Sequence, residues 1–206
     1  MIVNSDFIKP IYHKEYRCGG NIFDGKQEDC IGGVGFFIDN YFITAAHVVE
    51  NYPNAYIKTG DVDCMIPREN AIIWRSMPSK PIEEEYINPN KGDIAVFRFE
   101  NYISPLTLST QRPSFGDDLC CYHQVTGELQ AGIVGSLYWP KLLSSNFFDW
   151  RVKSDNIQYG FGDSGSPLLK DNTVYGVLHG GAGNVCLFTS SSFVKKLIDS
   201  LGSVRL

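Results

Sequence analysis

The chain has 206 residues, of which 43% are hydrophobic and 20% are charged. This composition excludes a disordered chain and is sufficient for one two-lobed unit with a sizeable core. The net charge of −5 argues against nucleic acid or an anionic membrane surface as a partner.

The first half of the chain is expected to consist of short strands that follow an N-terminal arm, residues 1–32. A helical turn at 45–50 interrupts these strands, and the polar, proline-containing stretch 75–91 is expected to be a surface loop. The apolar runs that predict strands in this half are 34–38, 41–44, 56–58, 64–66, 71–74 and 94–99.

The second half continues the β pattern and ends in a helix. Residues 104–113 are extended and bounded by prolines, as a crossover between two lobes would be. The runs that predict strands here are 118–125, 130–137, 168–170 and 173–178. Ser191 or Ser192 can cap the final helix, Gly202 would end it, and its apolar face consists of Phe193, Leu197, Ile198 and Leu201. Many short strands with regular turns and one terminal helix predict closed β-barrels.

Residues 138–155 are expected to form a large aromatic loop. Its aromatic side chains are Trp139, Phe147, Phe148 and Trp150. If exposed, the loop would be a contiguous apolar patch with a protein partner. If folded back, it would be part of the core, and the sequence leaves both alternatives open.

The cysteines bear on the redox compartment. An even number of cysteines allows three disulfides, but no Cys-x-x-Cys pair and no zinc-type Cys/His spacing occurs, so no metal or cofactor is expected. Cys120 and Cys121 would face opposite sides of a strand, which favours two separate thiols. The chain shows no secretory signal and no stretch long enough to span a membrane. We therefore expect reduced thiols and a cytoplasmic location.

A glycine-rich turn at 160–167, GFGDSGSP, carries one serine hydroxyl at its apex. Such a hydroxyl is a weak nucleophile that needs an adjacent base and backbone N–H groups aimed at the carbonyl oxygen it attacks. Taken alone, the turn has an ordinary alternative, a β-turn rich in Gly, Asp and Ser. Two upstream blocks, TAAHVV at 44–49 and GDIAVF at 92–97, favour chemistry, because they complete the order His, Asp, Ser.

Together the three blocks resemble the motifs of the chymotrypsin-like (trypsin-fold) serine peptidases. Their style is closest to the bacterial Deg-type and glutamyl-endopeptidase branch and to viral processing proteases. The resemblance implies an all-β fold of two antiparallel six-stranded β-barrels with a C-terminal α-helix. The N-terminal arm and first barrel would occupy 1–103, the crossover 104–113, the second barrel 114–190 and the helix 191–206.

The resemblance also implies roles for the site residues. Ser164 would be the nucleophile and His47 the general base, while Asp93 would orient the imidazole and stabilise its charged form. The backbone N–H groups of Gly162 and Ser164 would form the oxyanion hole. The stretch 31–34, IGGV, lies too close to His47 to be an activation N-terminus, so we expect an oxyanion loop that forms without a zymogen step.

The pocket for the substrate side chain would be built from Gln158, Tyr159, Leu178, His179 and Gly180. Gln158 lies where trypsin-like members carry an acid, so a preference for Arg or Lys is weakened. His179 could recognise Glu or Gln, as a histidine does in glutamyl endopeptidases and several viral proteases of this fold. In the alternative strand register, Leu178 lines the pocket and His179 points towards Asp93.

The leading hypothesis is a serine endopeptidase that cleaves a restricted protein or peptide substrate through an acyl-enzyme intermediate. The alternative from a different class is a non-catalytic protein-binding module, a pseudoprotease, although no triad member is missing. A third reading, an unrelated β protein with chance motifs, predicts that His47, Asp93 and Ser164 do not converge.

Overall fold

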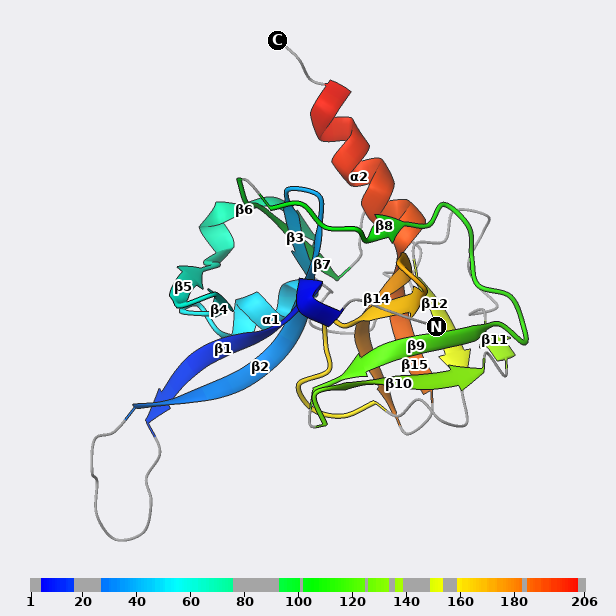
Figure 1. The fold of residues 1–206 in the computed structure, drawn as a ribbon, viewed down its shortest axis with the longest axis horizontal. Helices are drawn as coiled ribbons and strands as arrows, with labels where there is room; N and C mark the ends of the chain where they lie inside the picture. Colours follow the sequence, from blue (N-terminus) through cyan, green and yellow to red (C-terminus); the bar gives the residue numbers. More distant parts are fainter. Residues whose placement is uncertain are drawn as a thin grey trace, which may run out of the picture.

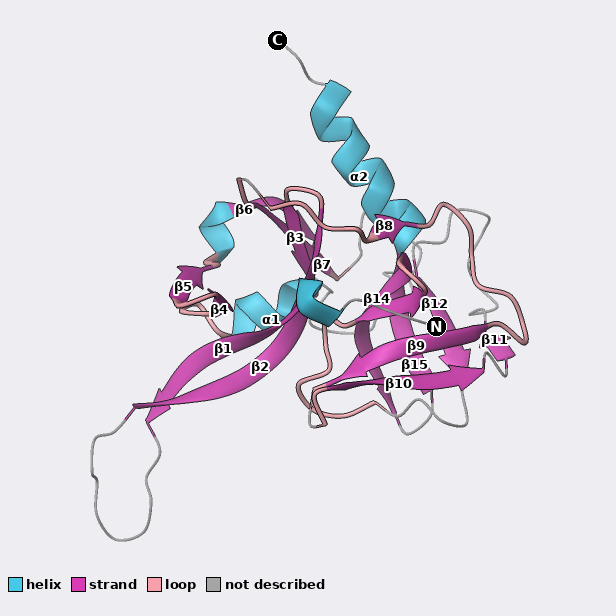
Figure 2. Ribbon diagram, in the orientation of Figure 1, coloured by secondary structure: helices cyan, strands magenta, loops and turns pink. Residues whose placement is uncertain are grey.

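The structure is a computed structural model that describes residues 5–16, 27–75, 93–100, 102–124, 126–133, 136–138, 149–153, 159–182 and 185–203. It contains two β-sheets, which appear side by side as two lobes in Figure 1. Strands form most of the regular structure, and one longer helix ends the described chain (Figure 2). The predicted all-β class is confirmed. In the described ranges, no helix is both long and apolar enough to cross a membrane.

The first sheet has seven antiparallel strands in the order β5-β4-β1-β2-β3-β7-β6. These strands are β1 (Ile8–Tyr16), β2 (Gln27–Ile38), β3 (Tyr41–Thr44), β4 (Tyr56–Thr59), β5 (Val62–Met65), β6 (Ala71–Arg75) and β7 (Ile94–Arg98). The helix α1 (Ala46–Asn51) follows β3, and two short 3-10 turns, η1 (Ser5–Phe7) and η2 (Arg68–Asn70), precede β1 and β6. The predicted stretch 75–91 lies outside the described residues, apart from Arg75 at the end of β6.

The second sheet has eight strands and contains the Ser164 loop. Seven of them follow the order β10-β9-β13-β14-β15-β12-β11, and β8 pairs with β14 in parallel. They are β8 (Thr107–Leu108), β9 (Asp118–His123), β10 (Glu128–Ile133), β11 (Ser136–Tyr138), β12 (Asp149–Lys153), β13 (Pro167–Lys170), β14 (Thr173–Ala182) and β15 (Val185–Ser190). The helix α2 (Ser191–Ser203) completes the chain.

β1 and β2 form a long hairpin that reaches out from the first lobe (Figure 1). The sequence predicts only an arm here, so β1 was missed, and β2 is longer than the predicted strand 34–38. The alternation of β1 is interrupted because Pro10 lies within it and a β-bulge shifts the register between Ile11 and Tyr12. The arm is therefore a paired strand that belongs to the first sheet.

The predicted strand 130–137 is two strands in the structure. β10 pairs with β9, whereas β11 pairs with β12. The single predicted strand is therefore wrong in this detail, because an apolar run does not reveal which neighbour each half pairs with. The predicted crossover 104–113 also contributes β8 to the second sheet. The domain boundaries proposed from the sequence remain a prediction.

One hydrophobic cluster is shared by both sheets and α2. On β2, the alternate residues Val34, Phe36 and Ile38 face this cluster, whereas Phe37 packs in a second cluster within the first lobe. The second sheet and α2 contribute Cys120, Leu169, Val174, Val177, Phe193 and Val194 to the shared cluster. Removing these apolar side chains from water stabilises the two lobes against each other.

The adjacent cysteines of β9 lie on opposite faces of the strand, as predicted. Cys120 belongs to the shared cluster, and Cys121 packs in a third cluster inside the second lobe. Among the described residues, five cysteines are free thiols, at positions 30, 64, 120, 121 and 186. The two neighbouring thiols are therefore separate packing groups.

The helix α2 is anchored through its first turn. The Ser191 hydroxyl does not cap the helix but donates to the backbone oxygen of Ser109 (2.8 Å). This hydrogen bond ties the helix to the crossover segment 104–113. Phe193 is buried and Leu197 packs against the shared cluster, whereas Leu201 is 40% exposed. The predicted apolar face is thus buried in the first turn and partly buried at Leu197 and Ile198.

Direct backbone contact joins β2 to the loop that carries Ser164. The Val34 N–H donates to the Ser164 oxygen (2.8 Å), and the Thr44 hydroxyl donates to the Val34 oxygen (2.6 Å). Gly165 lies against the same strand with a φ of +89°, and a Cβ built on it would lie 1.9 Å from the Val34 oxygen. Only glycine fits both this backbone conformation and this space.

We expect Gly165→Ala to lower the free energy of unfolding by about 3 kcal/mol or more, because the clash adds to the backbone strain. Gly116 is a matched control, since its φ is +83° and no atom lies within 4 Å of an added Cβ. Gly116→Ala should cost about 1 kcal/mol. Urea unfolding of both variants measures the difference, and equal losses would contradict the close approach at Gly165.

Candidate active site

His47 and Asp93 are brought together by neighbouring strands. Because Thr44 at the end of β3 pairs with Ala95 near the start of β7, the residue in the first turn of α1 meets the residue that precedes β7. The His47 backbone N–H donates to Asp93 Oδ1 (2.9 Å), and the ring nitrogen Nδ1 contacts Asp93 Oδ2. Asp93 is 1% exposed, so both of its oxygens are held away from water.

The buried carboxylate of Asp93 controls the ionisation of the imidazole. Burial by itself lowers the pKa of His47, but the hydrogen bond and the negative charge of Asp93 outweigh it, so the net pKa lies above 6.5. The imidazole has Nδ1 fixed towards Asp93, which leaves Nε2 as the nitrogen that can accept a proton from elsewhere.

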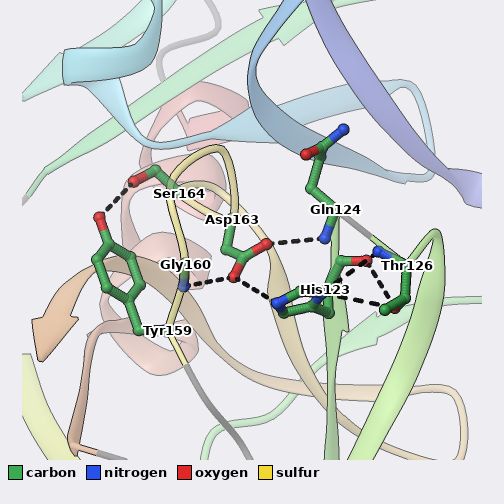
Figure 3. Close-up of polar contacts among 7 residues, drawn as sticks. All are labelled: His123, Gln124, Thr126, Tyr159, Gly160, Asp163 and Ser164. Atoms are coloured by element: carbon green, nitrogen blue, oxygen red, sulfur yellow. Dashed lines mark hydrogen bonds and ion pairs between the residues drawn. The ribbon is translucent and has the colours of Figure 1, made fainter. Parts of the chain in front are cut away.

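Ser164 lies close to α1, the helix that carries His47, because Gly33 packs against both. A Cβ built on Gly33 would lie 2.6 Å from Val48, the residue after His47, and 3.0 Å from the Ser164 backbone oxygen. The Ser164 side chain is buried, and its hydroxyl lies 3.4 Å from the Tyr159 hydroxyl (Figure 3). His47 and Ser164 are both described, and the His47 imidazole makes no hydrogen bond with the Ser164 hydroxyl in this structure.

The loop around Ser164 consists of two tight turns. The Asp163 N–H donates to the Gly160 oxygen (3.3 Å), the Ser166 N–H donates to the Asp163 oxygen (3.0 Å), and Gly162 between them has a φ of +90°. The described part of the chain provides no acceptor for the N–H groups of Gly162 and Ser164. Two neighbouring donors therefore remain available for a ligand.

A second buried carboxylate, Asp163, holds this loop in place. Its Oδ2 accepts the Gly160 N–H and its Oδ1 accepts the Gln124 N–H, both at 2.7 Å (Figure 3). The His123 Nε2 lies 3.8 Å from Oδ2. Because the Thr126 N–H donates to His123 Nδ1 (3.4 Å), a neutral His123 carries its proton on Nε2, facing the carboxylate.

The surroundings of Asp163 disfavour its charge. Burial raises the pKa of Asp163, and the two backbone N–H groups and His123 only partly oppose this effect. Because the folded-state pKa lies above the unfolded value, this group contributes most stability at low pH and loses it as the pH rises through the folded-state pKa. No pattern in the sequence points to His123, because it lies outside the three motifs.

The residues predicted for the substrate pocket are partly assembled. Leu178 and Tyr159 pack in the third cluster with Cys186 and Phe188, and the Tyr159 hydroxyl also contacts the Ser164 hydroxyl. His179 is buried and lies in an irregularity of β14, where the pairing with β15 shifts between Leu178 and Gly180, so simple alternation does not decide which side it faces. Gly180 is half-buried on β14, and Gln158 lies outside the described residues.

An exposed aromatic side chain borders the site and was not singled out from the sequence. Phe161 is 80% exposed on the loop directly before Gly162. The predicted aromatic loop 138–155 falls largely outside the described residues, where Trp139, Phe147 and Phe148 lie. Its ends belong to β11 and β12, so the loop is flanked by a strand pair.

Replacing Asp163 tests its role as the anchor of the loop. Asp163→Ala leaves two backbone N–H groups without an acceptor and should lower the free energy of unfolding by about 2–3 kcal/mol. Asp117→Ala is the control, because that carboxylate also accepts a backbone N–H, from Ser114 at 2.6 Å, but is only half-buried and pairs with the exposed Lys170 at 3.3 Å. The free energy of unfolding of Asp117→Ala should fall by less than about 1 kcal/mol. Similar urea midpoints for the two variants would contradict the role of Asp163 as the anchor of the loop.

Comparisons with known proteins agree with this architecture. The active form of the Rv3671c protease from M. tuberculosis has a TM-score of 0.60 and 19% identity, covering 96% of this chain and 82% of that one. The HtrA-type protease AlgW with a decapeptide has a TM-score of 0.64 and 14% identity, covering 97% and 65%. The scabies mite inactivated protease paralogue S-I1 has a TM-score of 0.60 and 17% identity, covering 97% and 96%.

At these identities the structural similarities show the fold alone. A search of curated proteins by sequence gives no significant match. The family model described as Trypsin, however, matches residues 29–190, which is well over half of the chain. The predicted resemblance and the two-barrel fold are therefore confirmed, and the chain belongs to the trypsin family, the chymotrypsin-like serine peptidases.

Proposed function

We propose that the protein is a serine endopeptidase in which Ser164 is the nucleophile, His47 the general base and Asp93 the residue that orients His47. The observation that carries this proposal is the contact of a buried Asp93 with a partly exposed His47, near a serine whose loop has two unused N–H donors. His47 Nε2 takes the hydroxyl proton as Ser164 attacks a peptide carbonyl, and later gives it to the leaving amine. Water then repeats the cycle on the acyl-enzyme.

The oxyanion of the tetrahedral intermediate would be held by the N–H groups of Gly162 and Ser164. Such a pair stabilises charge that develops only in the transition state, and losing one donor typically costs about 3 kcal/mol. The contacts of Asp163 support a loop that holds this arrangement without a new N-terminus, because its carboxylate is already satisfied by Gly160, Gln124 and His123.

In this proposal the contact between Tyr159 and Ser164 belongs to the resting enzyme. The serine hydroxyl has to leave Tyr159 and turn towards His47 before it can lose its proton. Catalytic hydrogen bonds that are long or absent in a free enzyme commonly form in the complex with substrate. A substrate side chain that enters beside Leu178 would displace the phenol and release the hydroxyl.

A protein or peptide is the substrate class that this chemistry requires, and the related AlgW was solved with a decapeptide. A restricted substrate, a cytoplasmic location and a preference for Glu or Gln through His179 stay predictions. The alternative is a non-catalytic binding module, which the missing His47–Ser164 hydrogen bond and the similarity to an inactivated protease paralogue favour.

Labelling with a fluorophosphonate, read by intact mass, separates the two functions. We expect one covalent adduct on the wild type, none on Ser164→Ala, and a rate reduced by at least about 10⁴-fold on His47→Ala. Tyr159→Phe is the matched control, since it keeps the ring and removes only the contact with Ser164, and it should label at least as fast as the wild type. A folded wild type and a folded Tyr159→Phe variant that both form no adduct would contradict the proposed peptidase and favour the binding module.

The ionisation of His47 provides a pH test of the same proposal. Because Asp93 raises the pKa of His47 above 6.5, an NMR titration of the imidazole should have its midpoint above that value. Asp93→Asn removes the charge, so the midpoint should fall and kcat should drop by about 10⁴-fold. A midpoint that does not move in Asp93→Asn would show that the two residues are not coupled.

A further inference from the structure

A group of metal-binding side chains lies on one face of the β1–β2 hairpin, away from the Ser164 site. His13 and Glu15 are two residues apart on β1, so they share a face. The register pairs His13 with Cys30 and Glu15 with Glu28, which places the two β2 residues on that face as well. Four side chains that can bind a metal therefore share one face of the two strands.

Three of these side chains are already close together. The His13 Nε2 and Glu15 Oε1 atoms are 2.7 Å apart, and the ligand atoms of His13, Glu15 and Cys30 all lie within 4.8 Å of one another. A tetrahedral zinc ion holds its ligand atoms about 3.3–3.8 Å apart. Small rotamer changes, of about 1 Å or less at each ligand atom, would bring the three atoms to that spacing.

The surroundings hold the histidine in position. The Tyr52 ring stacks on the His13 ring with centroids 3.7 Å apart and planes 16° from parallel. Gly32 makes this possible, since a Cβ there would lie 2.4 Å from the Tyr52 ring. His13 is 6% exposed, whereas Glu15 is exposed and Cys30 half-buried, so the group is packed against protein on one side and open to solvent on the other.

The charges on this face favour a cation. Glu15 and Glu28 stand directly opposite each other across the antiparallel pair, and like charges in that arrangement destabilise a sheet. The same face presents a thiol and an imidazole, which magnesium and calcium do not prefer but zinc does.

We propose that His13, Glu15 and Cys30, with Glu28 as the fourth donor, form a zinc-binding site. The ion would replace the His13–Glu15 hydrogen bond, deprotonate the Cys30 thiol and tie the two strands of the hairpin together. The Tyr52 ring that stacks on His13 belongs to the residue directly after α1, the helix that carries His47. The proposal does not depend on peptidase activity.

Cobalt titration of the Ser164→Ala protein, followed by absorption, tests this site without self-cleavage. We expect a thiolate-to-cobalt charge-transfer band with the visible bands of tetrahedral cobalt, and loss of both when zinc is added. Cys30→Ser should lose the charge-transfer band and bind at least about tenfold more weakly. Cys64→Ser is the matched control, because Cys64 is another half-buried thiol. It is hydrogen-bonded to the Thr59 hydroxyl within the neighbouring β4–β5 hairpin.

The fourth donor is tested in the same way. Glu28→Gln should keep the thiolate band and weaken cobalt binding by about 10-fold. Circular dichroism without metal shows that each variant is folded. The proposal is overturned by a folded protein with no thiolate band at millimolar cobalt, by a band that persists in Cys30→Ser, or by a band that Cys64→Ser abolishes.

Discussion

The contact between β2 and the Ser164 loop is the constraint on which the rest of this structure depends. Two sheets from different halves of the chain meet there through backbone atoms, with Val34 bonded to Ser164 and Gly165 pressed against the same strand. A backbone contact leaves no room for a side chain to adjust, so the glycine is obligatory. The hydrophobic cluster shared by both sheets stabilises the approach, and the polar contacts set its exact position.

Two buried carboxylates, one in each lobe, position the groups on either side of this contact. Asp93, from the first lobe, receives both the backbone and the ring of His47. Asp163, next to Ser164 in the second lobe, receives two backbone N–H groups and faces His123. A buried charge is tolerated only when such partners satisfy it. The first carboxylate therefore sets the ionisation of a side chain, and the second sets the shape of a loop.

The sequence was sufficient for the parts of the fold that depend on local pattern. Three short motifs led to the family, and alternation located most strands. It was insufficient where tertiary pairing decides, as in β1, whose pattern a proline and a bulge obscure. Nor could it find the contact of Tyr159 with Ser164, the position of His123, or the meeting of His13 with Cys30, because strand register and turn geometry bring these residues together.

The central claim is that the Ser164 loop is already arranged to hold an oxyanion. A crystal structure of the protein after reaction with a small fluorophosphonate tests it most directly. The account predicts a phosphonyl group on Ser164 Oγ, its oxygen within hydrogen-bond distance of the Gly162 and Ser164 N–H groups, and the Asp163 contacts unchanged. An adduct whose oxygen points away from both donors, or a loop that has to refold around Asp163 to reach it, would contradict the account.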